Sequence, residues 1–180
     1  KGILFTGMPG CGKTLMAKAI ATMAGVPVLI INGSDFINKY VGEGARKVRE
    51  LFAMAKVEAP VIIFIDEIDA IGGKRSTSGE GGEKEYTQTL NALLTEMDGF
   101  ATGNNNVIVI ASTNRDTNYL DPALNRRFEN KYHFSLPTLS DRFNIFQLYL
   151  KSVPCNADVS IKDLAAKTYG LSGANIEYIV

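Results

Sequence analysis

Gly7-Met-Pro-Gly-Cys-Gly-Lys13-Thr14 is the most informative segment of this 180-residue chain. It matches the pattern G-x-x-x-x-G-K-[ST] of phosphate-binding P-loops. An apolar run, Gly2 to Thr6, precedes it, and Lys13 to Ala24 carries apolar residues at helical spacing. Glycines let such a loop curl so that successive N–H groups face a phosphate, and the following helix adds the positive end of its dipole. The segment predicts a strand, a nucleotide-binding loop and a helix; the alternative is an ordinary glycine-rich turn.

Two side chains of this loop have predicted chemical roles. Lys13 would neutralise the β- and γ-phosphates of the nucleotide and so act in catalysis. Thr14 would give its hydroxyl to Mg²⁺, a hard cation that takes few protein oxygens and keeps several waters. Cys11 occupies a free position of the pattern, so no chemistry is expected of its thiol. The other residues predicted to bind the nucleotide here are Gly7, Pro9, Gly10, Cys11, Gly12 and Leu15.

A pair of acids follows the most continuous apolar run of the chain. Val61 to Ile65 is typical of a strand buried on both faces, and it ends in Asp66-Glu67. Asp66 is predicted to hold Mg²⁺ through water. Glu67 is placed to polarise an attacking water toward the γ-phosphate. The alternative is that the two acids only cap a short helix over residues 68–71.

The composition is that of an ordinary globular domain and excludes several classes of protein. Forty-six per cent of the residues are hydrophobic, and 19 basic residues balance 19 acidic ones, so no bulk charge attracts nucleic acid or anionic lipid. Each apolar run is too short to cross a bilayer. The two cysteines lie far apart in sequence, which favours a reducing, cytoplasmic location. The chain begins at Lys1 without Met, so we expect a piece of a longer protein, whose flanking segments could add organelle targeting or a membrane anchor.

Strands and helices alternate over most of the chain, which predicts right-handed crossovers and a mainly parallel sheet. Residues 1–137 are therefore expected to form a three-layer αβα P-loop domain with a five-stranded sheet, and residues 138–180 the start of a small helical lid. Gly72 to Gly82 has the composition of a mobile loop. The predicted strands are Gly2–Thr6, Val26–Ile31, Val61–Ile65, Asn106–Ala111 and Lys131–Phe134, and the main helices are Lys13–Ala24, Gly44–Val57 and Glu83–Met97, the last with Asp98-Gly99 as its exit.

These residues resemble the AAA family of hexameric ATPases over nearly the whole chain. Besides the P-loop, Phe64 to Asp69 is similar to the family's Walker B segment and Ser112 to Arg115 to its sensor-1 strand end. Leu120 to Leu124 is similar to the second region of homology, and Gly170 to Asn175 to the lid motif. The resemblance implies ATP and Mg²⁺ as ligands. It also implies that Asn114 positions the lytic water, and that Gly173 and Ala174 lie against the adenine.

Arg126 and Arg127 occupy the place of the family's arginine fingers, which reach the nucleotide of the neighbouring subunit. The resemblance therefore implies a homo- or hetero-hexamer in which both arginines are catalytic, because a guanidinium stays charged and offers planar donors to developing phosphate charge. In many members two residues separate these arginines, whereas here they are adjacent, as in katanin and spastin. The alternative is a pair of solvated surface arginines.

Lys39-Tyr40-Val41-Gly42 stands where the family carries an aromatic-hydrophobic-glycine pore loop. An exposed aromatic ring can grip a polypeptide of any sequence, because it offers area and a flat face rather than matched hydrogen bonds. A protein substrate passing through a central pore is therefore implied. Tyr40 could instead be a core or interface aromatic. The Gly72 to Gly82 loop, with Lys74 and Arg75, falls where a second pore loop would lie.

The similarities to subfamilies point in different directions. Gln88 to Phe100 resembles the membrane-anchored AAA proteases of the FtsH type, Lys39 to Glu43 resembles proteasomal ATPases and spastin, and the arginine pair resembles the severing group. The leading hypothesis is an ATP-hydrolysing motor that assembles into a ring and remodels, unfolds or translocates proteins. A nucleotide-gated scaffold with little turnover and a nucleic-acid motor are the alternatives. The intact Glu67 and Asn114 favour hydrolysis, and the zero net charge disfavours nucleic acid.

Overall fold

A computed structural model describes residues 2–37, 40, 42–73, 80–101, 106–154, 156 and 159–180 of the chain. The chain divides into two compact units. The α/β unit comprises Lys1–Thr6 and Thr14–His133, and the helical unit comprises Gly7–Lys13 and Phe134–Val180. Most of the P-loop thus groups with the C-terminal helices.

The sheet has five strands in the order β2-β3-β4-β1-β5. The pairs β1·β4, β2·β3 and β3·β4 are parallel, and the whole sheet is parallel as expected. Parallel register brings the carboxyl ends of neighbouring strands to one edge, where Asn32 is opposite Asp66 and Thr6 is opposite Thr113. The strands are β1 (Gly2–Gly7), β2 (Val28–Asn32), β3 (Val61–Asp66), β4 (Val107–Thr113) and β5 (Phe128–Phe134).

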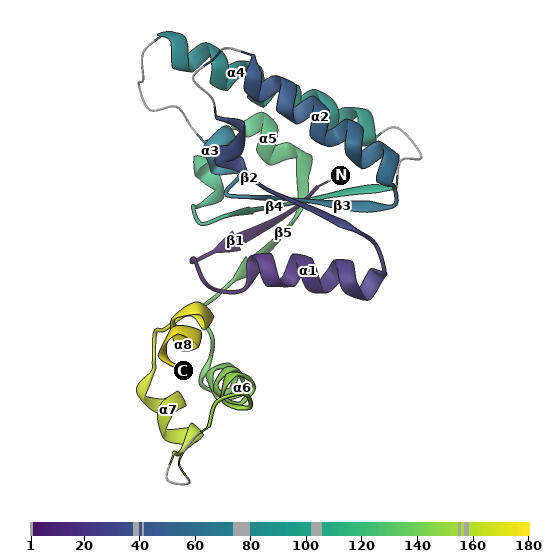
Figure 1. Cartoon of the computed structure of the whole chain (residues 1–180). Coiled ribbons are helices and arrows are strands. Elements are labelled where there is room, and N and C mark those ends of the chain that lie inside the picture. Colours follow the sequence, from purple (N-terminus) through teal and green to yellow (C-terminus); the bar gives the residue numbers. More distant parts are fainter. Residues whose placement is uncertain are drawn as a thin grey trace. The chain divides into compact units, whose positions relative to one another are not determined.

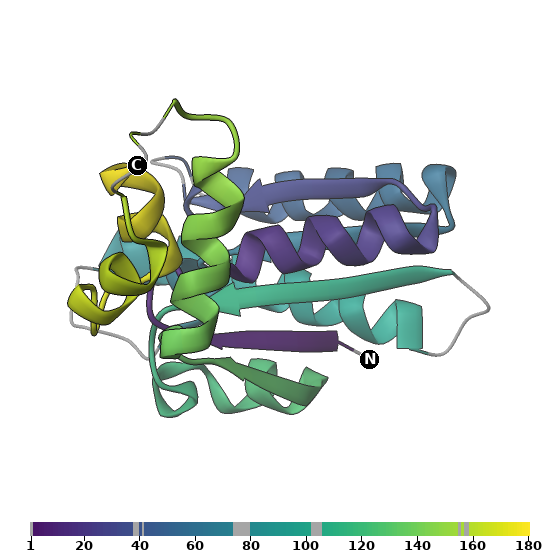
Figure 2. The ribbon, with the colours of Figure 1, turned by 90° about the horizontal axis from the view of Figure 1, so that it is seen from below.

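Helices cover both faces of this sheet and complete the predicted three layers. Helix α1 (Lys13–Ala24) lies on one face, and α2 (Glu43–Glu58) and α4 (Glu80–Ala101) lie on the other (Figure 1). Figure 2 shows α1 running alongside the strands. The remaining elements of the α/β unit are the 3-10 turns η1 (Gly33–Phe36) and η2 (Thr117–Tyr119) and the short helices α3 (Asp69–Gly72) and α5 (Pro122–Arg127).

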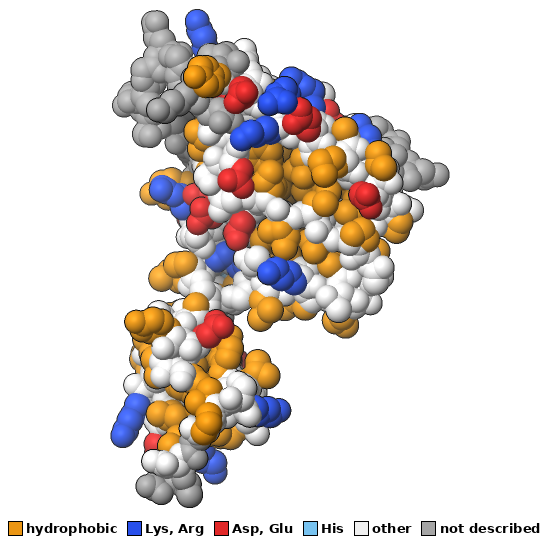
Figure 3. Space-filling model, viewed as in Figure 1, with side chains coloured by type: hydrophobic (Ala, Val, Ile, Leu, Met, Phe, Trp, Pro, Cys, Tyr) orange, Lys and Arg blue, Asp and Glu red, His pale blue; other side chains and the backbone are white. Residues whose placement is uncertain are grey.

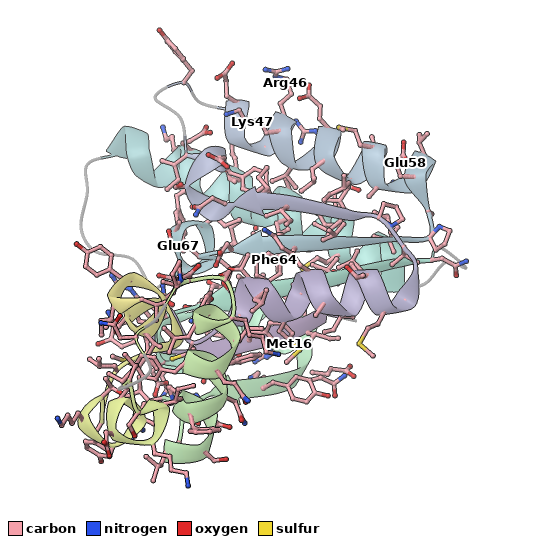
Figure 4. The ribbon with its side chains drawn as sticks, turned by 60° about the horizontal axis from the view of Figure 1, so that its bottom comes forward. Met16, Arg46, Lys47, Glu58, Phe64 and Glu67 are labelled. Atoms are coloured by element: carbon pink, nitrogen blue, oxygen red, sulfur yellow. The ribbon has the colours of Figure 1, made fainter. Side chains whose placement is uncertain are left out.

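Alternation along β3 divides the hydrophobic core between the two faces. Ile63 and Ile65 are fully buried in the cluster that α2 and α4 complete with Phe52 and Leu93. Phe64 points the other way, toward the α1 side where Met16 lies (Figure 4). A strand with apolar residues on both faces is stable only inside a sheet that is covered on both faces. The continuous apolar run Val61 to Ile65 therefore predicted an interior strand.

The surface of the α/β unit carries both charge and apolar area. Charged side chains line α2, where Arg46 pairs with Glu43 and Glu50, and hydrophobic side chains gather elsewhere on the face seen in Figure 3. Within the described ranges, no helix is both long and apolar enough to traverse a membrane.

Helix α4 is longer than predicted at both ends. It begins at Glu80 rather than Glu83, so the expected loop ends sooner, and residues 74–79 of that loop lie outside the described residues. The predicted exit at Asp98-Gly99 is wrong, because the helix continues to Ala101. The Asp98 carboxylate is held by Arg127, so it is not available to end the helix as a local turn residue does.

The helical unit contains α6 (Leu139–Leu150), α7 (Ile161–Lys167) and α8 (Gly173–Ile179). Phe146, Ala165 and Ile176 form its core, one residue from each helix. Capping boxes start two of the helices: Thr138 with Asp141 at α6, and Ser172 with Asn175 at α8. Each box satisfies N–H groups that have no partner within the helix.

Candidate functional site

The P-loop has the curled backbone that its glycines predict. Gly10 and Gly12 have φ angles of 75° and 92°, a region that residues with a Cβ avoid. The Lys13 side chain is only 6% exposed and turns back into the loop, where its Nζ donates to the carbonyl oxygens of Gly7 (2.8 Å) and Met8 (2.9 Å). The ammonium group is therefore held within the loop that would cradle phosphates. Pro9 and Leu15 are exposed, and Cys11 is half-buried.

The helical unit also joins the P-loop to the predicted lid motif. The Ala174 N–H donates to the Gly10 carbonyl oxygen at 3.1 Å. A Cβ on Gly10 would come within 2.6 Å of Ser172 Oγ and 2.9 Å of the Ala174 Cβ, so only glycine fits this contact. The structure thus brings Gly173 and Ala174, which are distant in sequence from the loop, against Gly10.

In the α/β unit, Asp66 gathers two hydroxyl groups at the end of β3. Thr14 Oγ1 donates to Asp66 Oδ2 at 2.9 Å, and Ser112 Oγ of β4 donates to Asp66 Oδ1. A carboxylate beside a threonine hydroxyl is a set of hard oxygen donors of the kind that Mg²⁺ takes. The two predicted metal residues, 52 positions apart in sequence, are therefore in direct contact.

Glu67 is exposed and has an unusual backbone. Its φ angle is 51°, in the left-handed region that costs a non-glycine residue about 1–3 kcal/mol and is found mainly at functional sites. Its Oε2 accepts from Asn32 Nδ2 at 3.4 Å. The Asn32 amide is oriented by Ser34, whose N–H and hydroxyl both donate to Asn32 Oδ1 (2.9 and 2.7 Å).

Two further residues of this edge, Ser112 and Asn32, were not predicted as functional from the sequence. Ser112 stands only within the stretch that is similar to the sensor-1 strand end, and Asn32 stands in no motif. The signal was present, because each polar residue lies at the carboxyl end of a strand next to β3, and parallel register places such residues beside Asp66 and Glu67.

Asn114 follows β4 directly, and residues on both sides of it are held by Asp69 of α3. Thr113 Oγ1 donates to Asp69 Oδ1 at 2.7 Å, and Arg115 Nε lies 3.2 Å from Asp69 Oδ2. Arg115 N–H also donates to Thr113 Oγ1 at 3.1 Å. The chain at Asn114 is therefore fixed to the short helix that follows Glu67.

The adjacent arginines at the end of α5 differ in their surroundings. Arg127 donates twice to Asp98 (Nε 3.0 Å, Nη2 2.8 Å) and once to the Ala123 carbonyl oxygen (3.0 Å). The hydrogen bond from Arg127 lowers the pKa of Asp98, and the same bond raises the pKa of Arg127. Arg126 is exposed. Arg127 is thus engaged within its own chain, whereas Arg126 faces solvent.

Tyr40 has the exposure that a pore-loop aromatic needs, with 75% of its surface accessible. Gly42 follows as the N-cap of α2, with φ of 89°. Lys39 and Val41, the other two predicted residues of this loop, lie outside the described residues.

Comparisons with known proteins agree with these observations. Residues 3–136 match the ATPase family associated with various cellular activities (AAA). The chain is 51% identical over 181 residues to an ATP-dependent zinc metalloprotease FtsH of Lactiplantibacillus plantarum, a match that covers 99% of this chain and 24% of the relative. The corresponding FtsH of Nitrosococcus oceani is 50% identical over 182 residues, covering 100% of this chain and 28% of the relative.

A third relative shows the same pattern. The ATP-dependent zinc metalloprotease FtsH 4 of Synechocystis is 49% identical over 183 residues, covering 100% of this chain and 29% of the relative. The chain therefore spans less than a third of the length of these proteins. The similarity to FtsH-type proteins, which the sequence suggested for Gln88 to Phe100, therefore extends over the whole chain. With the family match covering the P-loop, Asp66, Glu67 and the arginine pair, this chain belongs to the AAA family of ATPases.

Proposed function

We propose that this AAA ATPase domain binds Mg·ATP at the P-loop, hydrolyses it with Glu67 as the base, and uses the energy in a ring to remodel, unfold or translocate proteins. The observation that carries the ATPase part is the Asp66 carboxylate, which accepts from Thr14 and Ser112 one residue before Glu67. The meeting of these residues, which are separate in sequence, at one sheet edge supports the proposal that they bind and hydrolyse the nucleotide together.

Each residue has a defined task in this proposal. Thr14 and Asp66 would hold Mg²⁺, which when bound neutralises charge on the phosphate oxygens. Lys13 and the backbone amides of Gly7 to Gly12 would bind the phosphates, and Gly173 and Ala174 would lie beside the adenine. Their contact with Gly10 supports this placement, because it joins the lid motif to the loop.

Glu67 would take a proton from the attacking water, and Asn114 would orient that water. The exposure of Glu67 leaves its carboxylate accessible, and its left-handed backbone is supported by the packed strand end. Asn32 donates to the same carboxylate, so it restrains the direction in which Glu67 points. The Asp69 bonds to Thr113 and Arg115 would hold Asn114 in place.

The assembled protein is proposed to be a homo- or hetero-hexamer, with the domain divided at residues 1–137 and 138–180. Arg126 and Arg127 would complete the site of the adjacent subunit, and the exposed Tyr40 supports a pore loop for protein substrates, not nucleic acid. The names of the relatives include zinc protease activity, but this chain has one histidine, so any such chemistry would reside outside it. We infer a cytoplasmic position for the domain, with membrane association only through flanking segments.

The ATPase proposal is tested by separating nucleotide binding from turnover. Glu67→Gln should keep ATP affinity and reduce hydrolysis by a factor of about 100 to 10,000, the usual contribution of a general base. Lys13→Ala should abolish binding, measured with a fluorescent ATP analogue. Lys18→Ala, a change to an exposed lysine five residues further along α1, is the matched control and should bind normally. Unchanged turnover in Glu67→Gln would require a different base.

A further inference from the structure

We propose that Glu85 is a positioning residue that fixes the Tyr40 loop to α4, and that this bond couples ATP hydrolysis to movement of the protein substrate. No motif of the sequence pointed to Glu85. The inference rests on the proposed role of Tyr40 as a substrate-gripping residue.

Glu85 supplies a cap that α2 does not have in its own sequence. The N-cap of α2 is Gly42, which has no side chain to accept from the free N–H groups of the first turn. The Glu85 carboxylate accepts from both Gly42 N–H and Gly44 N–H, the latter at 2.9 Å. Negative charge at a helix N-terminus is also favoured by the helix dipole. A residue of α4 thus completes the start of α2.

One further hydrogen bond links the turn that Glu85 caps to Tyr40. The Glu43 N–H, between the two amides that Glu85 holds, donates to the Tyr40 carbonyl oxygen at 3.3 Å. The backbone of Tyr40 is therefore tied to the same turn of α2. Its ring remains exposed, so the loop can present the aromatic side chain while its base is held.

The contact between the two helices is too close to adjust freely. Glu85 is only 6% exposed, and α2 and α4 lie side by side (Figure 1). A Cβ on Gly44 would overlap the Phe36 carbonyl oxygen and Thr89 Oγ1. The start of α2 is therefore wedged against α4, and a displacement of α4 would carry the loop with it.

The next residue of α4, Tyr86, holds a different segment of the chain. Tyr86 Oη donates to the carbonyl oxygen of Gly73, which directly follows α3. Helix α3 is in turn fixed to the end of β4 through Asp69. Consecutive residues of α4 thus hold the base of the Tyr40 loop and the segment that follows Glu67, so one helix contacts both ends of the proposed coupling.

The test measures the amount of ATP hydrolysed per substrate molecule unfolded, in the assembled full-length protein. The substrate is a marginally stable protein with an unstructured tail and two dyes, whose energy transfer is lost on unfolding. Glu85→Gln keeps the side-chain size but replaces one accepting oxygen by an amide that faces an N–H. We expect the ATP hydrolysed per substrate unfolded to rise about tenfold, the loss typical of one charged hydrogen bond.

Glu96→Gln is the matched control. Glu96 lies on the same helix and pairs with Lys56 of α2 at 3.6 Å, so the change removes the same charge between the same helices but away from the loop. Its ATP cost per substrate should stay at the wild-type value. Glu85→Asp, which keeps the charge but withdraws it by one methylene, should raise the cost in the same direction and serves if Glu85→Gln does not assemble.

The outcomes separate this inference from the proposed function. If Glu85→Gln and Glu85→Asp lower hydrolysis and unfolding by the same factor, the ratio is unchanged and Glu85 is only structural. Tyr40→Ala, in the same assay, should lower the unfolding rate. If it does and the Glu85 variants keep a normal ratio, the coupling through Glu85 is wrong while Tyr40 retains its role. If Tyr40→Ala unfolds substrate normally, the proposed function of the loop fails.

Discussion

The Asp66 carboxylate is held by residues of two other elements. Thr14 at the start of α1 and Ser112 on β4 each donate a hydroxyl to one of its carboxylate oxygens. Ser112 is almost fully buried, and its Oγ also accepts from the Glu67 N–H at 3.4 Å. A buried serine that contacts both Asp66, the proposed metal ligand, and Glu67, the proposed base, orients the two residues together.

Ser112→Ala should therefore reduce ATP hydrolysis by about tenfold, because a hydrogen bond to a charged group is lost at a buried position. The stimulation of hydrolysis by added Mg²⁺ should shift to higher concentration, which a titration of the rate against Mg²⁺ measures. Thr95→Ala removes an exposed hydroxyl of α4 that donates to the Asn91 carbonyl oxygen, and it should leave both quantities unchanged. An unaltered rate in Ser112→Ala would show that Asp66 needs no orientation by β4.

The Asp98–Arg127 pair predicts a pH dependence of stability. The pKa of Asp98 is lower in the folded chain than its ordinary value of 3.8, chiefly through the hydrogen bond from Arg127. The pair therefore stabilises the fold above that value, and the stabilisation is lost as the pH falls through the pKa of the folded state. Because Asp98 is exposed, the free energy of unfolding of the wild type should exceed that of the Asp98→Asn variant by less than about 1 kcal/mol at neutral pH.

Urea unfolding of both forms at a series of pH values measures this difference. It should be constant near neutrality and disappear in acid. Asp98→Asn should also release Arg127, since an uncharged side chain holds a guanidinium more weakly. A difference that grows on acidification would have the opposite sign and would contradict the assignment.

Local motifs pointed to Lys13, Thr14, Asp66 and Glu67 as candidate site residues, since each stands in a pattern whose chemistry uses it, and their roles stay predictions. Asn32, Ser112 and Glu85 could not be found in this way. Their partners lie 35 to 46 positions away in sequence, and the contacts arise from strand register and helix packing. Such residues look like ordinary polar positions until the elements are placed.

At the scale of elements, helix α5 carries the two arginines of the proposed contact between protomers in its last turn. It is only six residues long, and Asp121 caps it by accepting from the Ala123 N–H at 2.8 Å and the Leu124 N–H at 3.4 Å. Pro122 at the first position suits a helix start, because its missing N–H would have had no partner. A helix of this length depends on its cap more than a long one does.

Asp121→Ala should lower the free energy of unfolding by about 1 kcal/mol, the typical cost of losing an N-cap. Hydrolysis by the assembled protein should fall by more than this loss of stability explains, because the positions of Arg126 and Arg127 become less defined. Asp121→Asn keeps a capping oxygen and should behave like the wild type in both measurements. Equal effects of the two substitutions on urea unfolding would show that the cap contributes nothing.

Element boundaries were predicted well where the sequence itself contains the stop signal. Helix α1 ends at Ala24 before Gly25, as expected, whose φ of 66° suits glycine. The end of α4 was mispredicted because Asp98-Gly99 has the local signature of a turn, yet Arg127 of another helix takes up the aspartate. Strand β5 begins three residues earlier than expected, where buried Phe128 joins the core. Tertiary contacts moved both boundaries.

At the scale of the whole molecule, the proposed hexamer would have a site in one protomer completed by a residue of another. Arg126 and Arg127 lie on an exposed helix end, and Arg127 is bound by Asp98 within the chain. Arg126 is therefore the better residue for testing action between protomers, since its removal leaves that internal ion pair intact. Glu67, by contrast, should act on the nucleotide of its own protomer.

Mixing two inactive variants tests this division of labour. Arg126→Ala protomers keep Glu67, and Glu67→Gln protomers keep Arg126, so a mixed ring contains interfaces at which both residues are present. If the arginine acts between protomers, a random equal mixture should recover about a quarter of the wild-type rate per protomer, because half of the sites are intact and half of those have an intact neighbour. Arg46→Ala, which removes an exposed arginine from α2, should need no complementation. A mixture that stays as inactive as its components would place Arg126 outside the neighbouring site, since no arrangement of the two variants would then restore a working pair.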